Sequence, residues 1–233
     1  MRYLYFFLLS LSLFTLPQQS LAQNIKDTKK LKIVTSIAPI YALMLNVSQN
    51  TDEVYLLLRP NISPHHFHLK PSQVKWLQQS DAIFYIDPNF ETPLAKLLTS
   101  KQMQSKKIIA LADTVNDKLL MARGQHKENQ NHRHEHGHHH DHEKEHEHEH
   151  HKCKCCQIGL HDYHIWLDPH LAIDIAKTIA KTLSELNPQA ADIYHKNTEN
   201  LISNLQSLIK KTQLSHIKNN PYPAYMVYHD AYQ

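Results

Sequence analysis

Glycine is the residue that this chain most lacks, with only 3 among 233 positions. The glycine-rich phosphate loops and the G-x-S-x-G nucleophile turn are therefore absent. The chain also lacks an excess of either charge, because 25 Lys and Arg stand against 22 Asp and Glu. A dedicated nucleic-acid binder would need a basic stripe, and this near balance argues against one. Histidine, by contrast, is abundant at 21 residues.

Cysteine is as scarce as glycine, and its 3 residues are Cys153, Cys155 and Cys156. A disulfide framework would spread an even number of cysteines along the chain, so this cluster does not indicate one. Two interpretations stay open. Thiolates beside a histidine tract suit zinc or copper, whereas in an oxidising compartment the three would oxidise among themselves and leave one odd thiol.

Long apolar runs are lacking beyond the first 22 residues. Arg2 precedes the uncharged run 3–16, and Ser20-Leu21-Ala22 then places small residues two apart, as signal peptidase requires. The run is shorter than the roughly 20 residues that a membrane-spanning helix needs. We therefore predict a cleaved signal peptide, a mature chain that starts at Gln23, and a soluble protein exported to the bacterial periplasm.

Short apolar segments alternate with helical patterns between residues 31 and 111. Strands are predicted from length and β-branched composition, and helices from apolar residues three or four positions apart. The predicted strands are 31–37, 53–58, 81–86 and 107–111, and the predicted helices between them are 41–47, 71–80 and 90–98. This order implies an α/β fold, a parallel sheet with helices on both faces.

Two further helices are predicted at 171–186 and 190–217, separated by Asn187-Pro188. The second would be about 40 Å long at 1.5 Å per residue, enough to connect two bodies. A strand begins at Tyr225, and the chain stops soon after. The predicted organisation is a signal peptide (1–22), an N-terminal α/β lobe (23–124), a His-rich insertion (125–156), a return to that lobe (157–187), a long connecting helix (188–220) and the first strand of an incomplete C-terminal lobe (221–233).

Twelve histidines lie between His126 and His151, together with seven acidic and three basic residues. Residues 125–152 contain no aliphatic or aromatic side chain, so we expect a disordered insertion that joins no core. H-E-x-x-H occurs three times in this tract, but a zinc protease needs that motif on a docked helix, and this repeat has no apolar face. The tract is interpreted as a low-specificity metal collector; its alternative is an inert acidic linker.

Three short segments outside the tract also carry histidine. They read SPHHFHLKPS at 63–72, YHIWLDP at 163–169 and YHDAY at 228–232. In open α/β sheets, ligands bind beyond the carboxyl ends of the strands, which is where the first segment is predicted to lie.

These three segments, in this order and with the His-rich insertion and the long helix, resemble the periplasmic metal-binding proteins of ABC importers, specifically the high-affinity zinc-uptake (ZnuA-like) type. The resemblance runs from about Lys30 to the last residue and implies that His65, His164 and His229 bind Zn²⁺ as the transported ligand. Three neutral imidazoles suit zinc and leave a fourth position open. The local competitors, ranked below these three, are His66, His68, His161 and His170.

The resemblance implies a binding protein rather than an enzyme, one that delivers zinc to an ABC membrane permease, and we expect it to be a monomer. It also implies a second lobe beyond residue 233, so we expect this chain to be a fragment or a truncated product. Two alternatives are a His-rich periplasmic metal buffer and a manganese-binding relative, which would use a carboxylate as the third ligand. A zinc hydrolase would need a general base, and neither Asp168 nor Asp230, the carboxylates near the histidine segments, has an evident role as one.

Overall fold

The computed structural model describes residues 29–122, 161–218 and Ala231. The predicted signal peptide, the His-rich insertion with its cysteines and, apart from Ala231, the predicted C-terminal strand lie outside these residues. Within the described part, no helix combines the length and the apolar composition that crossing a bilayer requires.

A four-stranded parallel sheet forms the centre of the fold, in the order β2-β1-β3-β4. Its strands are β1 (Lys32–Thr35), β2 (Glu53–Leu56), β3 (Ala82–Tyr85) and β4 (Lys107–Ala110). The central strand β3 is buried along its whole length, as expected of a parallel strand that is covered on both faces. The predicted α/β class and all four predicted strands are confirmed.

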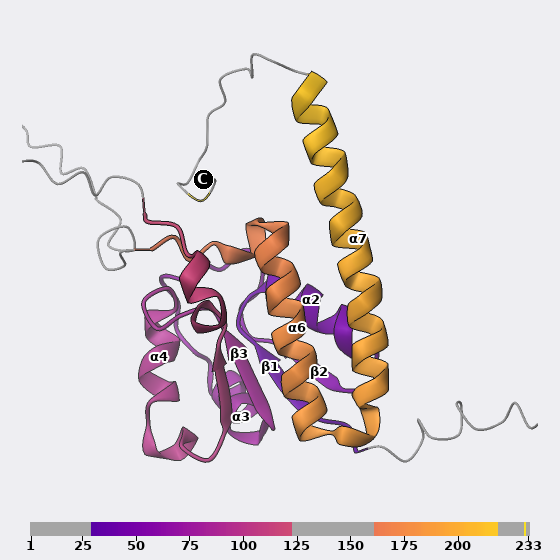
Figure 1. Cartoon of the computed structure of the whole chain (residues 1–233). Helices are drawn as coiled ribbons and strands as arrows, with labels where there is room; N and C mark the ends of the chain where they lie inside the picture. Colours follow the sequence, from indigo (N-terminus) through magenta and orange to yellow (C-terminus); the bar gives the residue numbers. More distant parts are fainter. Residues whose placement is uncertain (1–28, 123–160, 219–230, 232–233) are drawn as a thin grey trace, which may run out of the picture.

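Helices cover both faces of this sheet (Figure 1). They are α2 (Ala38–Ser48), α3 (Pro71–Gln79), α4 (Thr92–Leu98), α6 (Pro169–Leu186) and α7 (Ala191–Lys218). Helices α2, α6 and α7 pack together on one side, with α3 and α4 on the other. The split follows from the strand order, because the chain moves one way along the sheet from β1 to β2 and the other way from β2 to β3 and β4. Right-handed crossovers in opposite directions place their helices on opposite faces.

The helix boundaries have local causes. Helix α2 begins three residues before the predicted start, because Pro39 is favoured in the first turn of a helix. Asp168 caps α6, where its carboxylate accepts a hydrogen bond from the His170 amide at 2.7 Å. Four short 3₁₀ segments complete the described part: η1 (Lys101–Met103), η2 (Ala112–Lys118), η3 (Ile165–Leu167) and η4 (Pro188–Ala190).

Residues on either side of the His-rich insertion share one core. Ile175, Ile179 and Leu183 of α6 are fully buried in the same cluster as Ile33 and Phe84 of the sheet. Helix α7 is rooted in this cluster through its first turns and then extends beyond the other described elements (Figure 1). This is the long helix that the sequence predicts.

Candidate metal centre

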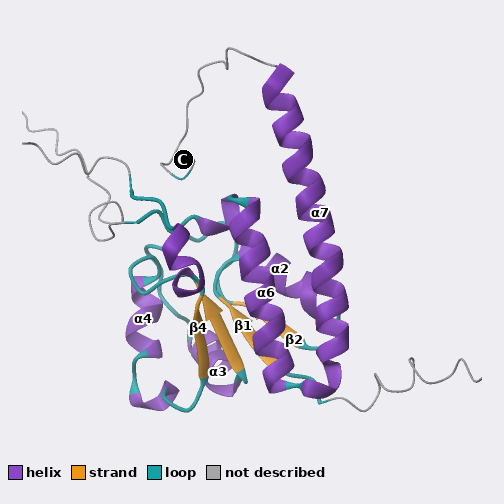
Figure 2. Ribbon diagram, in the orientation of Figure 1, coloured by secondary structure: helices purple, strands orange, loops and turns teal. Residues whose placement is uncertain are grey.

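The candidate site lies where the strands end. Figure 2 shows loops gathered beyond the arrowheads of the sheet. Three of them matter here: the loop after β2 carries His65, the loop after β3 carries Phe90, and the segment that leads into η3 carries His164. Carboxyl ends of parallel strands meet at one edge, so segments 25 to 100 residues apart come together there.

His65 is held by its Nδ1 atom, which lies 3.2 Å from the backbone carbonyl oxygen of Phe90. A carbonyl only accepts hydrogen bonds, so Nδ1 must carry the proton. A neutral His65 imidazole in this tautomer has the lone pair on Nε2, which is the atom that binds a metal. The contact therefore orients the ring and selects a tautomer that can bind a metal through Nε2.

His164 is held in an equivalent way by a carboxylate. Asp162 Oδ1 lies 2.7 Å from His164 Nδ1, and the same oxygen accepts the backbone N–H of His164 at 3.0 Å. Both side chains are largely buried, with 13% and 10% of their surface exposed. A carboxylate behind Nδ1 is a common support of zinc-binding histidines, because it fixes the ring and raises the basicity of Nε2.

The two imidazoles belong to one cluster of aromatic rings and lie nearly perpendicular to each other, with 70° between the ring planes. Their centroids lie 6.4 Å apart. The Phe90 ring contacts both, at 4.6 Å from His65 and 5.3 Å from His164. Trp166 packs edge-on against His164 at 5.2 Å and against Phe90 at 5.6 Å. Edge-to-face packing of this kind restricts the rotation of the histidine rings.

Carboxylates surround the end of β3. Burial, Asp87, Asp113 and Glu91 together raise the pKa of Tyr85 to about 12. Burial also raises the pKa of Asp87 and, to about 7, that of Glu91. A partly enclosed edge lined by acidic groups concentrates cations rather than anions.

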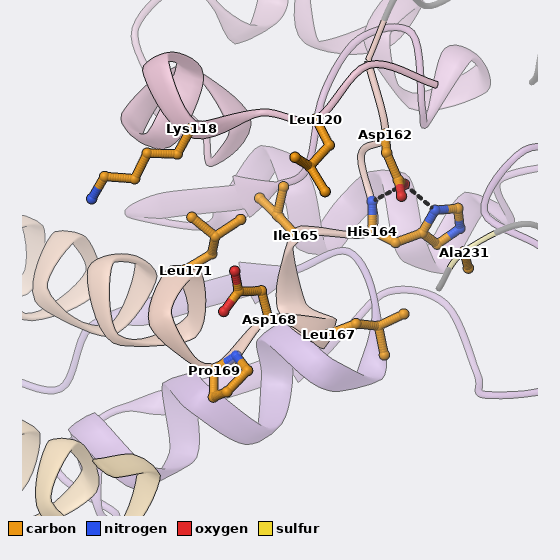
Figure 3. Close-up of a pocket in the computed structure, with 10 residues that line it drawn as sticks. All are labelled: Lys118, Leu120, Asp162, His164, Ile165, Leu167, Asp168, Pro169, Leu171 and Ala231. Carbon is orange, nitrogen blue, oxygen red and sulfur yellow. Dashed lines mark hydrogen bonds and ion pairs between the residues drawn. The ribbon is translucent and has the colours of Figure 1, made fainter. Parts of the chain in front are cut away.

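A hollow of about 360 Å³ opens beside His164. It is lined by the end of η2, by η3, by the start of α6 and by Ala231 (Figure 3). Ala231 is buried, although it comes from the far end of the chain. Figure 3 shows the His164 ring directed toward Ala231, on the side away from Leu171 and Pro169. Ala231 therefore lines the same hollow as His164.

The structure brings together two of the three predicted ligands, His65 and His164. His229 lies outside the described residues, so its placement stays a prediction. Of the competitors, His66, His68 and His170 are exposed, and His161 packs on Tyr163 with centroids 6.4 Å apart. Within 29–122, 161–218 and 231, no three His, Cys, Asp or Glu side chains form a group that could hold a metal ion.

Sequence reasoning missed the supports of the two histidines. Asp162 precedes His164 by two positions, a spacing that lets one carboxylate reach both the backbone and the ring, and this signal was available. The sequence predicts Phe90 within a helix, whereas it lies in the turn before α4. Its part in the site depends on a backbone carbonyl, which no side-chain pattern reveals.

Comparison with protein families gives one match over most of the chain. Residues 33–233 match the family model described as zinc-uptake complex component A, periplasmic. The high-affinity zinc uptake system protein ZnuA of Brucella abortus (strain 2308) is 36% identical over 212 residues, which cover 86% of this chain and 62% of that protein. The zinc-binding protein AdcA of Streptococcus pyogenes serotype M1 is 28% identical over 200 residues, 86% of this chain and 36% of that protein.

Solved structures agree on the fold. The Zn(II)-bound ZnuA-like domain of Streptococcus pneumoniae AdcA superposes with a TM-score of 0.55 at 27% identity, over 78% of this chain and 54% of that chain. The periplasmic zinc-binding protein TroA from Treponema pallidum, at 19% identity, superposes with a TM-score of 0.58 over 77% of this chain and 53% of that chain. The chain spans about a third to two thirds of the length of these relatives.

Proposed function

We propose, because the chain belongs to the family of periplasmic zinc-uptake components, that it captures Zn²⁺ outside the inner membrane and delivers it to an ABC-type membrane permease. Zinc is the transported cargo and takes part in no chemical step, so we propose a binding protein and not an enzyme. A cleaved signal peptide over residues 1–22 would bring the chain to the periplasm, where we expect it to act as a monomer.

The observation that carries this proposal is the pair His65 and His164. Two Zn–N bonds of about 2.0–2.1 Å, with half a ring on each side, span roughly 5–6 Å between ring centres. The observed separation of 6.4 Å is close to that span, so a small inward movement of either ring suffices. Both Nδ1 atoms are engaged by acceptors, so Nε2 of each ring would be the atom that binds the ion.

We further propose His229 as the third ligand. It lies two residues before Ala231, which lines the hollow beside His164. Three imidazoles favour zinc, whereas a carboxylate at the third position would favour manganese. The division of the chain into a lobe (23–124 and 157–187), a His-rich insertion (125–156), a connecting helix (188–220) and the start of a second lobe (221–233) belongs to the same proposal.

Zinc affinity and stoichiometry test the proposal, measured by calorimetry or competition with a chelator. The protein should be compared with a variant that lacks residues 125–156. If the cleft is the transport site, the deletion lowers the number of zinc ions bound and spares the tightest one, because flexible side chains must be ordered on binding whereas lobe-anchored ones are already placed. Loss of the tightest ion with the tract would favour the metal-buffering alternative instead.

Single substitutions in the tract-deleted variant then identify the ligands. Losing one of three ligands should weaken zinc binding by at least tenfold for His65→Ala, His164→Ala and His229→Ala. His170→Ala is the matched control, because His170 is an exposed histidine close to the site. Tight binding that persists in His65→Ala or His164→Ala would contradict the proposed site. Persistence in His229→Ala alone would remove only the third ligand.

A further inference from the structure

The loop between β3 and α4, residues 86–91, contacts both histidine segments. Its Phe90 carbonyl accepts from His65 Nδ1, and its Phe90 ring packs on His65 and His164. On the other side, Asn89 Nδ2 donates to the Tyr163 hydroxyl at 3.3 Å, one residue before His164. The shape of this one loop therefore sets the placement of the two predicted ligands relative to each other.

Glu91 holds the loop in that shape. Its side chain turns back along the chain, and Oε2 accepts the backbone N–H groups of Ile86 at 2.7 Å and of Asp87 at 3.2 Å. The Glu91 amide in turn donates to the Asp87 carbonyl at 3.0 Å. These bonds tie the start of the loop, at Ile86 and Asp87, to its end at Glu91, and Phe90 lies between these two ends.

This arrangement is unusual for a glutamate at a helix start. Glu91 occupies the N-cap position of α4, yet its carboxylate makes no capping bond with that helix. The side chain is completely buried, which is costly for a group that ionises. A glutamate that only favoured the helix N-terminus would do so from the surface, so the burial points to the loop that it closes.

We propose that Glu91 is a positioning residue for metal capture: by fixing the β3–α4 loop, it places the Phe90 carbonyl that orients His65 and the Phe90 ring that packs on both His65 and His164. The inference rests on the proposed function for its consequence, zinc affinity, but not for its geometry. It concerns a residue that touches neither the cargo nor, in any described contact, a predicted ligand.

Two substitutions of similar volume test it. Glu91→Gln keeps an oxygen that accepts from both amides, whereas Glu91→Leu fills the space and accepts nothing. Two readouts are measured in each full-length variant at pH 8: the tautomer of His65, from the ¹⁵N shifts of its ring without metal, and the affinity for Zn²⁺. Asp52→Asn is the matched control, a buried carboxylate at the opposite end of the sheet.

In the wild-type protein and in Glu91→Gln, His65 should carry its proton on Nδ1. In Glu91→Leu, the tautomers should become mixed and zinc affinity should fall at least tenfold, while Glu91→Gln and the control stay within about threefold of wild type. A Glu91→Leu protein that keeps the Nδ1 tautomer overturns the inference, and so does a loss in Glu91→Gln equal to that in Glu91→Leu.

The tautomer readout separates this inference from the proposed function. If the wild-type protein does not bind zinc tightly but Glu91→Leu still gives mixed tautomers of His65, the proposed function fails and the positioning by Glu91 stands. If Glu91→Leu does not fold, Glu91→Asp replaces it, and the His65 tautomer and the zinc affinity are measured in the same way. The aspartate side chain is one methylene shorter, so its carboxylate cannot reach both amides from an unchanged backbone.

Discussion

Buried carboxylates lie at both ends of the sheet, and their partners differ. At the amino ends of the strands, Asp52 accepts from the Leu31 amide at 3.0 Å and from the Tyr194 hydroxyl at 2.8 Å. These partners are 21 and 142 positions away in the sequence. At the carboxyl ends, Glu91 accepts from Ile86 and Asp87, only five and four positions away. Asp52 joins distant parts of the chain, whereas Glu91 shapes a single loop.

The two ends of the lobe therefore have different structural roles. The Asp52 network attaches the base of α7 to the sheet, and Asn187 extends it by donating to the Lys29 carbonyl at 3.1 Å. Asn197 adds another bond, from its amide to the Val47 carbonyl at 2.9 Å. Because these contacts span the whole fold, losing one should affect global stability. Contacts of the Glu91 loop should affect the histidines first.

The strongest test of this contrast is Asp52→Ala. The substitution leaves the Leu31 N–H and the Tyr194 hydroxyl buried without their acceptor, so we expect a loss of about 3 kcal/mol in the free energy of unfolding. Zinc affinity should change by less than about threefold, since Asp52 lies at the opposite end of the sheet from the candidate metal site. Urea unfolding and zinc titration of the same sample measure both. A large fall in zinc affinity of the folded variant would contradict the separation of the two ends.

Much of this fold could be predicted from the sequence, because its elements follow strong local rules. All four strands are short apolar runs, and the structure reproduces the predicted helix start at Pro71 and the predicted break at Asn187-Pro188. The strand order could not be read in the same way, since apolar runs do not reveal which strands are neighbours.

The candidate site was predictable only in part. His65 and His164 could be chosen through the resemblance to the zinc-uptake family, and the structure brings them together. The residues that support these two histidines could not be predicted, because the Phe90 contact uses a backbone carbonyl and the Glu91 side chain turns away from its own helix. A glutamate beside a predicted helix start is most simply interpreted as favouring the helix N-terminus, and that interpretation hides the loop closure.

The pH dependence of the free energy of unfolding tests the environment of the other buried carboxylate, Glu91. Burial raises the pKa of Glu91 from 4.5 to about 7, and the neighbouring Ser36 hydroxyl and two amides offset only part of this effect. An acid with a raised pKa in the folded state favours folding at low pH. This benefit is complete below about pH 4.5 and is lost as the pH rises through about 7.

Glu91→Gln removes this titration, so it should stabilise the fold at pH 8 by about 3 kcal/mol and by almost nothing near pH 4.5. The measurement is the difference in unfolding free energy between variant and wild type at several pH values, which cancels the titration of shared groups. Glu185→Gln is the control for the loss of an exposed carboxylate, one that is paired with Lys107. A difference for Glu91→Gln that does not grow between pH 4.5 and pH 8 would mean that Glu91 is not an unusually placed acid.

The smallest expected effect comes from Tyr194→Phe, which removes one oxygen from the Asp52 network. Burial and Asp52 raise the pKa of the Tyr194 phenol above its ordinary value of 10, so the hydroxyl remains a donor at every pH of interest. Its hydrogen bond lowers the pKa of Asp52, which burial raises. Without the hydroxyl, the Asp52 carboxylate keeps the Leu31 amide as its described hydrogen-bond donor.

For Tyr194→Phe we expect a loss of about 1.5 kcal/mol in the free energy of unfolding at pH 7, in the range for a hydrogen bond to a charged group. The loss should shrink as the pH falls toward 4 and Asp52 takes up a proton, because a neutral acid depends less on this donor. Urea unfolding at both pH values measures the change, and Tyr41→Phe, which alters a tyrosine outside this network, serves as the control. A loss independent of pH would mean that Tyr194 contributes packing alone, and the base of α7 would then be held by its apolar contacts rather than by the buried carboxylate.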